Sequence, residues 1–133
     1  MKVLTFPTKG YTDIIDITPQ IQREIDQQGI KEGVIHLFVI GSTASLTTIE
    51  ADKNLYDDLK EVLEKIAPYK KGWRHHQTWG DDNGASHLRA SIFGPDLNVP
   101  IAKGELVLGT WQKIVLIDFD TRERVREVVM EIM

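Results

Sequence analysis

The run GVIHLFVI, residues 33–40, is continuous, apolar and rich in β-branched side chains, and it has the length of a strand. Such a run predicts a strand at the centre of a sheet, buried on both faces. His36 lies inside the run, and a lone histidine in a buried strand is more often a hydrogen-bonded core residue than a ligand. We therefore expect a central strand here, and His36 is not among the candidate site residues.

Two helices are predicted, one before and one after this strand in the sequence. The first begins at Thr18, which is followed by a proline in the first turn, and it ends at Gly29. The second runs from about Asn54 to Ala67, because leucine, valine and isoleucine recur there at helical spacing before a proline ends the pattern. Both helices come early in the chain, which favours an α+β fold over a regular alternation of strands and helices.

Strands outnumber helices in the rest of the pattern. Further strands are predicted over residues 2–6, 12–17 and 86–94 and, interrupted by Gly109, over 105–120. The first two are expected to pair as a hairpin, and residues 95–104 are expected to form a loop. The tail, residues 122–133, fits the spacing of a helix and the valine content of a strand, so its periodicity leaves both open.

The composition excludes several classes of protein. The chain has 133 residues, enough for one domain, and its net charge of −4 disfavours broad binding to nucleic acid or to an anionic membrane. It contains no cysteine, which excludes disulfides, thiolate metal sites and a cysteine nucleophile. The first residues lack the features of a signal peptide, and no stretch approaches the length of a membrane span. A cytoplasmic protein is therefore expected.

The segment HHQTWGDDNGASH, residues 75–87, contains three of the four histidines. Its aspartates, asparagine and glycine favour tight turns, so we expect a loop that folds back and brings His76 toward His87. Two imidazoles and a carboxylate form a ligand set for zinc or a similar divalent ion, and equally an acid–base set. A polar turn without function is the alternative, and the residues alone leave the two about equal.

The segment GSTASLTTIE, residues 41–50, directly follows the predicted central strand. Its hydroxyl and backbone N–H groups can donate to a phosphate or a carboxylate at the end of the sheet. An ordinary turn or a threonine-rich strand is the alternative and is favoured by the spacing alone. Glu50 could be a metal ligand, a general base or an ion-pair partner.

Two shorter segments also hold candidate residues. In LGTWQK, residues 108–113, Trp111 could stack on a planar ligand and Gln112 could form a hydrogen bond with it, although a core tryptophan is the more frequent case. In TRERVR, residues 121–126, three arginines could bind an anion. Surface pairing with neighbouring aspartates is the favoured interpretation of these arginines.

The order of these segments resembles that of the YjbQ-like family, also called the secondary thiamine-phosphate synthase family. The resemblance rests on GSTASLTTIE, HHQTWGDDNGASHLRASIFGP, VPIAKGELVLGTWQKIVLIDFD and RERVREVV, and it covers nearly the whole chain. It implies a single α+β domain over residues 1–133, with a strongly bent mixed or antiparallel sheet that closes toward a barrel and two outer helices. It also implies a homotrimer with polar pockets near the subunit contacts, and a strand at residues 122–133.

The family resemblance also implies site residues. The activity attached to the family name is a weak coupling of a pyrimidine pyrophosphate to a thiazole phosphate. The implied catalytic residues are His76, Asp82, His87 and Glu50. The implied substrate- or phosphate-binding residues are Ser42, Thr43, Asn83, Thr110, Trp111 and Gln112. His76 and His87 are also the residues expected to hold a divalent cation, zinc or magnesium, but Gly41 stands where many family members have histidine, which argues against a three-histidine metal site.

Two functions follow from these residues. The first is an enzyme acting on a small phosphorylated or pyrophosphorylated substrate, in which a cation and hydrogen-bond donors neutralise the charge of a leaving group. The alternative is a non-catalytic homotrimer that binds a small anionic metabolite or a metal ion with the same residues. In both cases we expect a small anionic partner, and neither nucleic acid nor a membrane.

Overall fold

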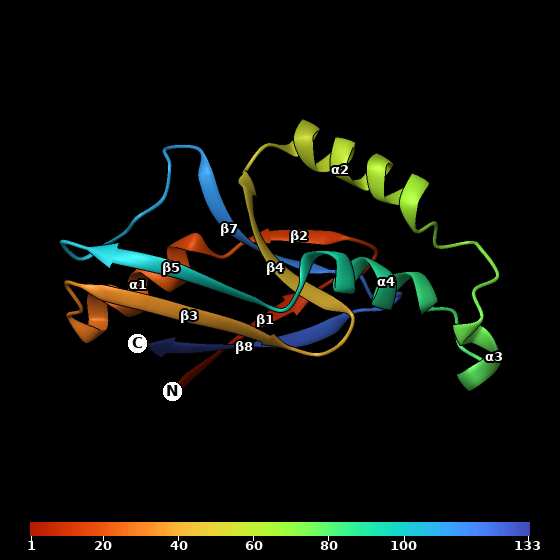
Figure 1. Ribbon diagram of the computed structural model, residues 1–133, viewed down its shortest axis with the longest axis horizontal. Helices are drawn as coiled ribbons and strands as arrows, with labels where there is room; N and C mark the ends of the chain where they lie inside the picture. Colours follow the sequence, from red (N-terminus) through yellow and green to blue (C-terminus); the bar gives the residue numbers. More distant parts are fainter.

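The strand at residues 33–40 is β3 (Gly33–Ile40), and it lies inside an antiparallel sheet in the computed structural model, which describes residues 1–133 (Figure 1). The strand order in this sheet is β1 (Lys2–Thr8), β8 (Arg124–Ile132), β3, β5 (Asp96–Ala102) and β6 (Glu105–Leu106). The tail is therefore a strand, as the family resemblance implies. It pairs with β1 on one side and with β3 on the other.

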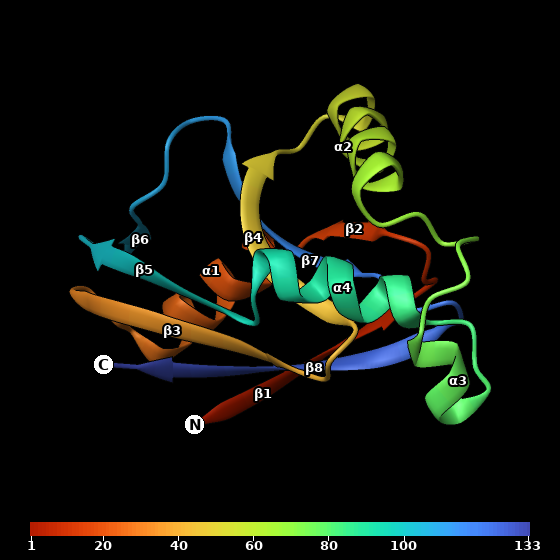
Figure 2. The same ribbon diagram turned by 45° about the vertical axis from the view of Figure 1, so that its right-hand side comes forward.

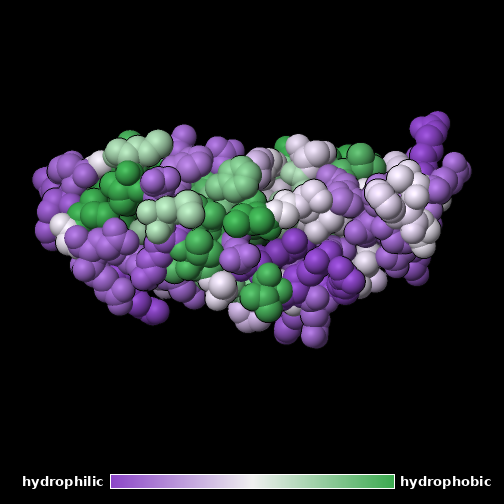
Figure 3. Space-filling model, turned by 90° about the horizontal axis from the view of Figure 1, so that it is seen from below, coloured by the Kyte–Doolittle hydropathy of each residue, from purple (hydrophilic) through white to green (hydrophobic).

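The inner face of β3 is buried, but its outer face is not. Leu37 is fully buried, whereas Phe38 and Ile40 are 40% and 48% exposed. The prediction that β3 is buried on both faces is therefore wrong, because apolar side chains on its outer face have no covering layer. Seen from below, hydrophobic residues gather over the left and central parts of the molecule, and hydrophilic residues dominate its right-hand end (Figure 3).

A second antiparallel sheet holds β2 (Asp13–Asp16), β7 (Gln112–Asp118) and β4 (Ala44–Glu50), with β7 in the middle. The chain passes between the two sheets where β3 is followed by β4 and β7 by β8 (Figures 1 and 2). Buried side chains of both sheets pack together with Ile21 and Ile25 of α1 (Thr18–Gln28). The strands thus form a strongly bent antiparallel arrangement, and the predicted α+β class is confirmed.

The structure contains four helices, two more than the family resemblance implies. α1 ends at Gly29, whose φ of 66° is left-handed, and α2 (Lys53–Ile66) begins at Asp52, whose carboxylate accepts from two backbone N–H groups. Both were predicted within a residue or two. The additional helices are α3 (His75–Trp79) and α4 (Gly84–Phe93), and α4 packs against β4 (Figure 2). None of the helices has the length and apolar character needed to cross a membrane.

Three local predictions are wrong. β1 and β2 form no hairpin: β1 pairs with β8, whereas β2 pairs with β7 in the other sheet. Tyr11 and Thr12, between them, have φ values of 53° and 64°, and this left-handed backbone carries the chain from one sheet into the other. Residues 86–93 belong to helix α4, which Gly94 caps, and are not a strand, and residues 95–104 contain strand β5 where a loop was expected.

Candidate functional site

A cavity of about 460 Å³ lies where the loop after β3, helix α3, the start of α4 and the start of β8 meet. We call it the arginine pocket, because Arg122, Arg124 and Arg126 line it against a single acidic residue, Asp81. The other lining residues are Gly41, Ser42, Thr43, His75, Trp79, Asn83 and His87. Four of the residues predicted to be functional thus come together here, namely Ser42, Thr43, Asn83 and His87.

Two of the arginines are held by aspartates behind the pocket. Arg126 is only 5% exposed and binds Asp118 with two hydrogen bonds, from Nε at 3.0 Å and from Nη2 at 2.8 Å. Arg124 binds Asp120 through Nε at 2.7 Å. Thr43 links the two pairs, because its Oγ1 accepts from Arg126 at 2.6 Å and donates to Asp120 at 3.3 Å. Such two-pronged pairing fixes the plane of a guanidinium group.

Asp120 is ionised because of its hydrogen-bond donors. Its burial raises the pKa of the carboxyl group, but the backbone N–H of Thr121 and the Arg124 guanidinium outweigh burial and bring the pKa below its ordinary value of 3.8. The Thr121 N–H donates at 2.8 Å. The Asn83 side-chain amide lies between the carboxylates of Asp120 and Asp81. The negative charge behind the pocket is therefore permanent at neutral pH.

The remaining donors of the arginines face the pocket. Arg126 uses Nε and Nη2 for Asp118 and Thr43, which leaves Nη1 without a hydrogen-bond partner in the chain. Nη1 points at Gly41: a Cβ placed on that glycine would lie 2.7 Å from it. Arg122 is exposed and forms no ion pair with any carboxylate of the chain. These donors, together with Ser42, can bind a small anion.

The histidine that meets His87 is His75, and not His76 as predicted. The His75 and His87 rings are 4.7 Å apart between centroids and tilted by 46°. His75 Nδ1 also lies 3.1 Å from Asp81 Oδ1, although outside the angular range of a hydrogen bond. Residues 75–79 form helix α3, in which neighbouring side chains point about 100° apart. His75 and His76 therefore face different cavities.

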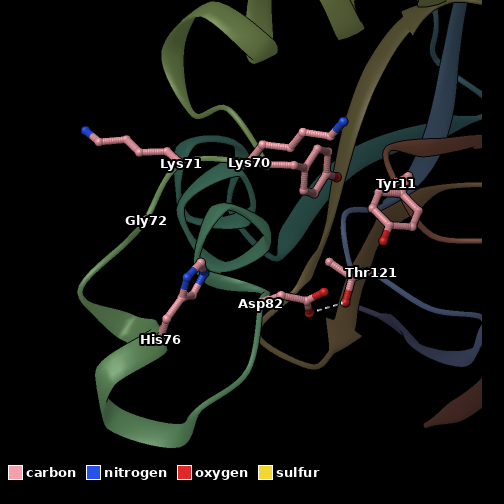
Figure 4. Close-up of a pocket in the computed structure, with 8 residues that line it drawn as sticks. Tyr11, Lys70, Lys71, Gly72, His76, Asp82 and Thr121 are labelled. Atoms are coloured by element: carbon pink, nitrogen blue, oxygen red, sulfur yellow. Dashed lines mark hydrogen bonds between the residues drawn. The ribbon is translucent and has the colours of Figure 1, made fainter.

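His76 and Asp82 line a second cavity, of about 470 Å³, which we call the tyrosine pocket (Figure 4). Tyr11, Tyr69, Lys70, Lys71, Gly72 and Thr121 complete its lining. Asp82 accepts a hydrogen bond of 3.0 Å from Thr121, and Lys71 points away from the cavity. Nε2 of His76 is buried without a hydrogen-bond partner. Burial raises the pKa of Tyr69, whose hydroxyl donates to the Phe119 carbonyl at 2.8 Å.

The predicted residues at positions 50 and 110–112 lie at the other end of β4 and β7. Glu50 is paired with Gln112, six residues along β7 from Asp118 at the arginine pocket, or about 20 Å at the usual rise of a strand. Gln112 donates to Thr48 at 3.2 Å, and Trp111 is 72% exposed. Within one chain, the structure does not bring Glu50, Thr110, Trp111 and Gln112 to the arginine pocket.

The predicted ligands of a divalent cation are also not brought together. His76 and His87 line different cavities, and no group of three histidine, aspartate or glutamate side chains is close enough to hold a metal ion. Of the three arginines around His75 and His87, Arg124 and Arg126 are paired with aspartates, but Arg122 has no carboxylate partner and its positive charge opposes a cation. Within one chain, the arginine pocket fits an anion better than a metal ion.

Several residues of the site were missed or misjudged from the sequence. Arg126 was expected to pair at the surface, but it is buried. The signal for its burial is the alternation of β8, where Arg126 shares a face with Val128 and Met130. His76 is the predicted partner of His87, but the helical turn of α3 brings His75 to His87 instead. Nothing in the sequence pattern indicates the roles of Tyr11 and Lys70 in the tyrosine pocket.

The chain is similar to a family of conserved proteins along its whole length. Residues 2–133 match the family model described as UPF0047 protein YjbQ-like. A UPF0047 protein of Archaeoglobus fulgidus is 35% identical over 128 residues, which cover 96% of this chain and 97% of that one. A crystal structure of an uncharacterised YjbQ/UPF0047 protein from Clostridium acetobutylicum has a TM-score of 0.90 at 30% identity, with both chains fully covered. A conserved hypothetical protein from Thermus thermophilus has a TM-score of 0.86, also at 30% identity and full coverage of both chains.

Proposed function

This chain belongs to the YjbQ-like UPF0047 family, and we propose that it binds a small phosphorylated metabolite in the arginine pocket. The single observation that carries the proposal is the preorganised pair of arginines. Asp118 and Asp120 fix the guanidinium groups of Arg126 and Arg124, and Nη1 of Arg126 is left free at the pocket. Donors held in place before binding lose little conformational freedom when an anion arrives.

The residues that line the arginine pocket fit a phosphate group better than a carboxylate. Arg126 Nη1, the unpaired guanidinium of Arg122 and the hydroxyl of Ser42 approach the pocket from the start of β8 and from the loop after β3. A phosphate offers three acceptor oxygens in different directions, whereas a carboxylate offers two in one plane. Donors that approach from separate elements match the geometry of a phosphate group.

We further propose a catalytic role for the histidines, in which His87 exchanges a proton with the bound substrate and His75 orients its ring. His87 lies beside the arginines and in contact with His75, as an acid–base group next to a phosphate site requires. The family resemblance makes the coupling of a pyrimidine pyrophosphate to a thiazole phosphate the first reaction to test. In that reaction the thiazole nitrogen would bond to the carbon that carries the pyrophosphate as the C–O bond breaks, and His87 would donate a proton to the departing oxygen. Pyrophosphate would leave into the arginine pocket, where the free guanidinium donors stabilise it. The alternative is a non-catalytic binder that uses the same arginines.

Calorimetric titration with inorganic phosphate and pyrophosphate tests the binding proposal. Arg122→Gln removes a guanidinium that has no partner in the chain, so the fold is preserved, and we expect phosphate affinity to fall about tenfold or more. Arg74→Gln is the matched control, because Arg74 is also exposed but lies outside the lining of the arginine pocket. Equal affinities of the wild type and Arg122→Gln would overturn the proposal.

Turnover of the two thiamine precursors separates the enzyme from the binder. Phosphate binding with turnover that His87→Gln abolishes supports catalysis. Binding without turnover supports the non-catalytic alternative.

A further inference from the structure

We propose that the ligand of the arginine pocket carries a compact apolar group, which packs into a separate apolar cavity beyond Gly41 and His87. This inference rests on the proposed binding of a phosphorylated metabolite and adds the other half of the ligand. The apolar cavity has a volume of about 440 Å³. It lies between the end of β3, the start of β4 and helix α4, and its apolar lining residues are Phe38, Ala44, Ala90 and Pro95.

The two cavities adjoin each other, because Gly41, Ser42 and His87 line both of them. A ligand held by the arginines needs to pass only these three residues to reach the apolar cavity. Gly41 has no side chain to close the passage, and its φ of 128° is unfavourable for any residue that has one. A Cβ at this position would also collide with Nη1 of Arg126. The glycine therefore keeps open the junction between the charged and the apolar cavities.

Apart from Ser42 and His87, where the two cavities meet, the polar groups around the apolar cavity already have partners. The Ala90 carbonyl accepts from Ser45 Oγ at 2.8 Å and from the Gly94 N–H at 2.9 Å. The Gly94 and Pro95 carbonyls accept from backbone N–H groups of β4 and β3. Ser91 donates to the Leu88 carbonyl at 2.8 Å.

A ligand that enters this cavity therefore finds few free hydrogen-bonding groups. Such a wall favours a hydrocarbon group over a sugar or an amide, because a polar group would lose its hydrogen bonds to water. The ligand class that fits both cavities is a phosphate monoester of a small apolar alcohol or phenol. Its phosphate would contact Arg122 and Arg126, and its hydrocarbon would lie against Phe38 and Ala90.

Inorganic phosphate and phenyl phosphate separate the two halves of the ligand. Calorimetric titration of the wild-type protein should show phenyl phosphate binding about tenfold or more tightly than phosphate, because only the ester buries apolar surface. Ser91→Trp places a large side chain at the exposed edge of the apolar cavity and leaves the arginines in place. In this variant we expect phosphate affinity to be unchanged and the preference for phenyl phosphate to be lost. Gln27→Trp is the control, since Gln27 is also exposed on a helix but borders neither cavity.

The outcomes distinguish this inference from the proposed function. If neither compound binds the wild type, the arginine pocket is not a phosphate site and both proposals fall. If phosphate binds but phenyl phosphate binds no more tightly, only the inference of an apolar group is overturned. A loss of preference in Gln27→Trp equal to that in Ser91→Trp would also overturn it, because the preference would then not arise in this cavity.

Discussion

Gly41 is the residue at which the backbone and the arginine pocket constrain each other most tightly. We expect Gly41→Ala to lower the free energy of unfolding by about 1–3 kcal/mol, because its φ of 128° is strained for alanine and the added Cβ would lie 2.7 Å from Arg126 Nη1. We also expect weaker phosphate binding, since Arg126 must move. Urea denaturation and calorimetric titration measure the two effects.

A second glycine provides the control for this prediction. Gly72 has no positive φ, and a Cβ there would meet no atom within 4 Å. Gly72→Ala should therefore be neutral or stabilising by up to about 1 kcal/mol, because it restricts the unfolded chain. If Gly41→Ala and Gly72→Ala lower the free energy of unfolding equally, the backbone φ of Gly41 and its contact with Arg126 do not account for the effect.

Asp120 should make stability depend on pH in the acid range. Its pKa is lowered in the folded state below the ordinary value of 3.8, so the unfolded chain binds its proton first as the pH falls. The stabilisation by Asp120 is therefore fully present above about pH 5, and it is lost as the pH falls through the folded-state pKa. In Asp120→Asn, the slope of the unfolding free energy against pH should decrease in this range, by at most about 1.4 kcal/mol per pH unit.

Urea denaturation of the wild type and of Asp120→Asn between about pH 2.5 and about pH 6 measures these slopes, from roughly one unit below to roughly two units above the ordinary aspartate value. The variant will be less stable at neutral pH, because Arg124 loses its carboxylate partner. The test is the difference in slope, which a general destabilisation does not change. Equal slopes of the unfolding free energy against pH in the acid range would contradict a lowered pKa of Asp120 in the folded state.

At the scale of the element, helix α4 is held by one buried arginine. Arg89 is 1% exposed, and it donates to the Ala67 carbonyl at 2.9 Å, to Thr12 at 2.9 Å and to Glu64 at 2.6 Å. Its guanidinium also stacks over the Tyr69 ring at 3.9 Å. Arg89→Met should lower the free energy of unfolding by about 2–4 kcal/mol, because the buried acceptors lose their donor.

Urea denaturation tests this prediction. The control is Arg74→Met, because Arg74 is an exposed arginine at the N-cap of α3. The control should change the unfolding free energy by less than about 0.5 kcal/mol. Near-wild-type stability of Arg89→Met would show that α4 is anchored by other contacts.

Arg89 also explains why the sequence misplaces this element. Hydrophobic periodicity predicts a strand at residues 86–94, because apolar residues alternate at positions 88, 90 and 92. In the structure Leu88 and Ile92 are exposed on one face of a helix, while Arg89 is inside. The rule that apolar side chains face the core is inverted here. By contrast, α1 and α2 have ordinary caps and spacing, and the sequence predicts both correctly.

The residues of the candidate site could also be predicted only in part. The family resemblance places Ser42, Thr43, Asn83 and His87 among the candidate site residues, and the structure brings these four to one cavity. The predicted pairing of the arginines with neighbouring aspartates is confirmed for Arg124 with Asp120 and for Arg126 with Asp118. The sequence does not predict that the second pair is buried beside Thr43, because that contact joins residues 83 positions apart and has no local signature. For the same reason, the choice between His75 and His76 depended on a five-residue helix that the sequence does not reveal.

At the scale of the whole molecule, the five-stranded sheet leaves an apolar row uncovered. Val129 is opposite Val3 on one side and Phe38 on the other, so these three side chains share the outer face. Ile40 extends the row, at 48% exposed. We propose that copies of the chain associate through this face in the homotrimer that the family resemblance implies. Association would also give the exposed Trp111 a partner surface that a single chain does not supply.

Phe38→Asp tests this proposal, because a carboxylate at the centre of the row must be desolvated if the face is buried between copies. We expect sedimentation velocity to show a trimer for the wild type and mainly monomer for the variant at the same concentration. Ile66→Asp is the control, since Ile66 is similarly exposed but lies on α2, away from the sheet face. A trimer that survives Phe38→Asp and dissociates with Ile66→Asp would place the contact on α2, whereas a monomeric wild type would exclude the homotrimer. Because Phe38 also lines the apolar cavity, dissociation that weakens phenyl phosphate binding would connect assembly to the ligand site.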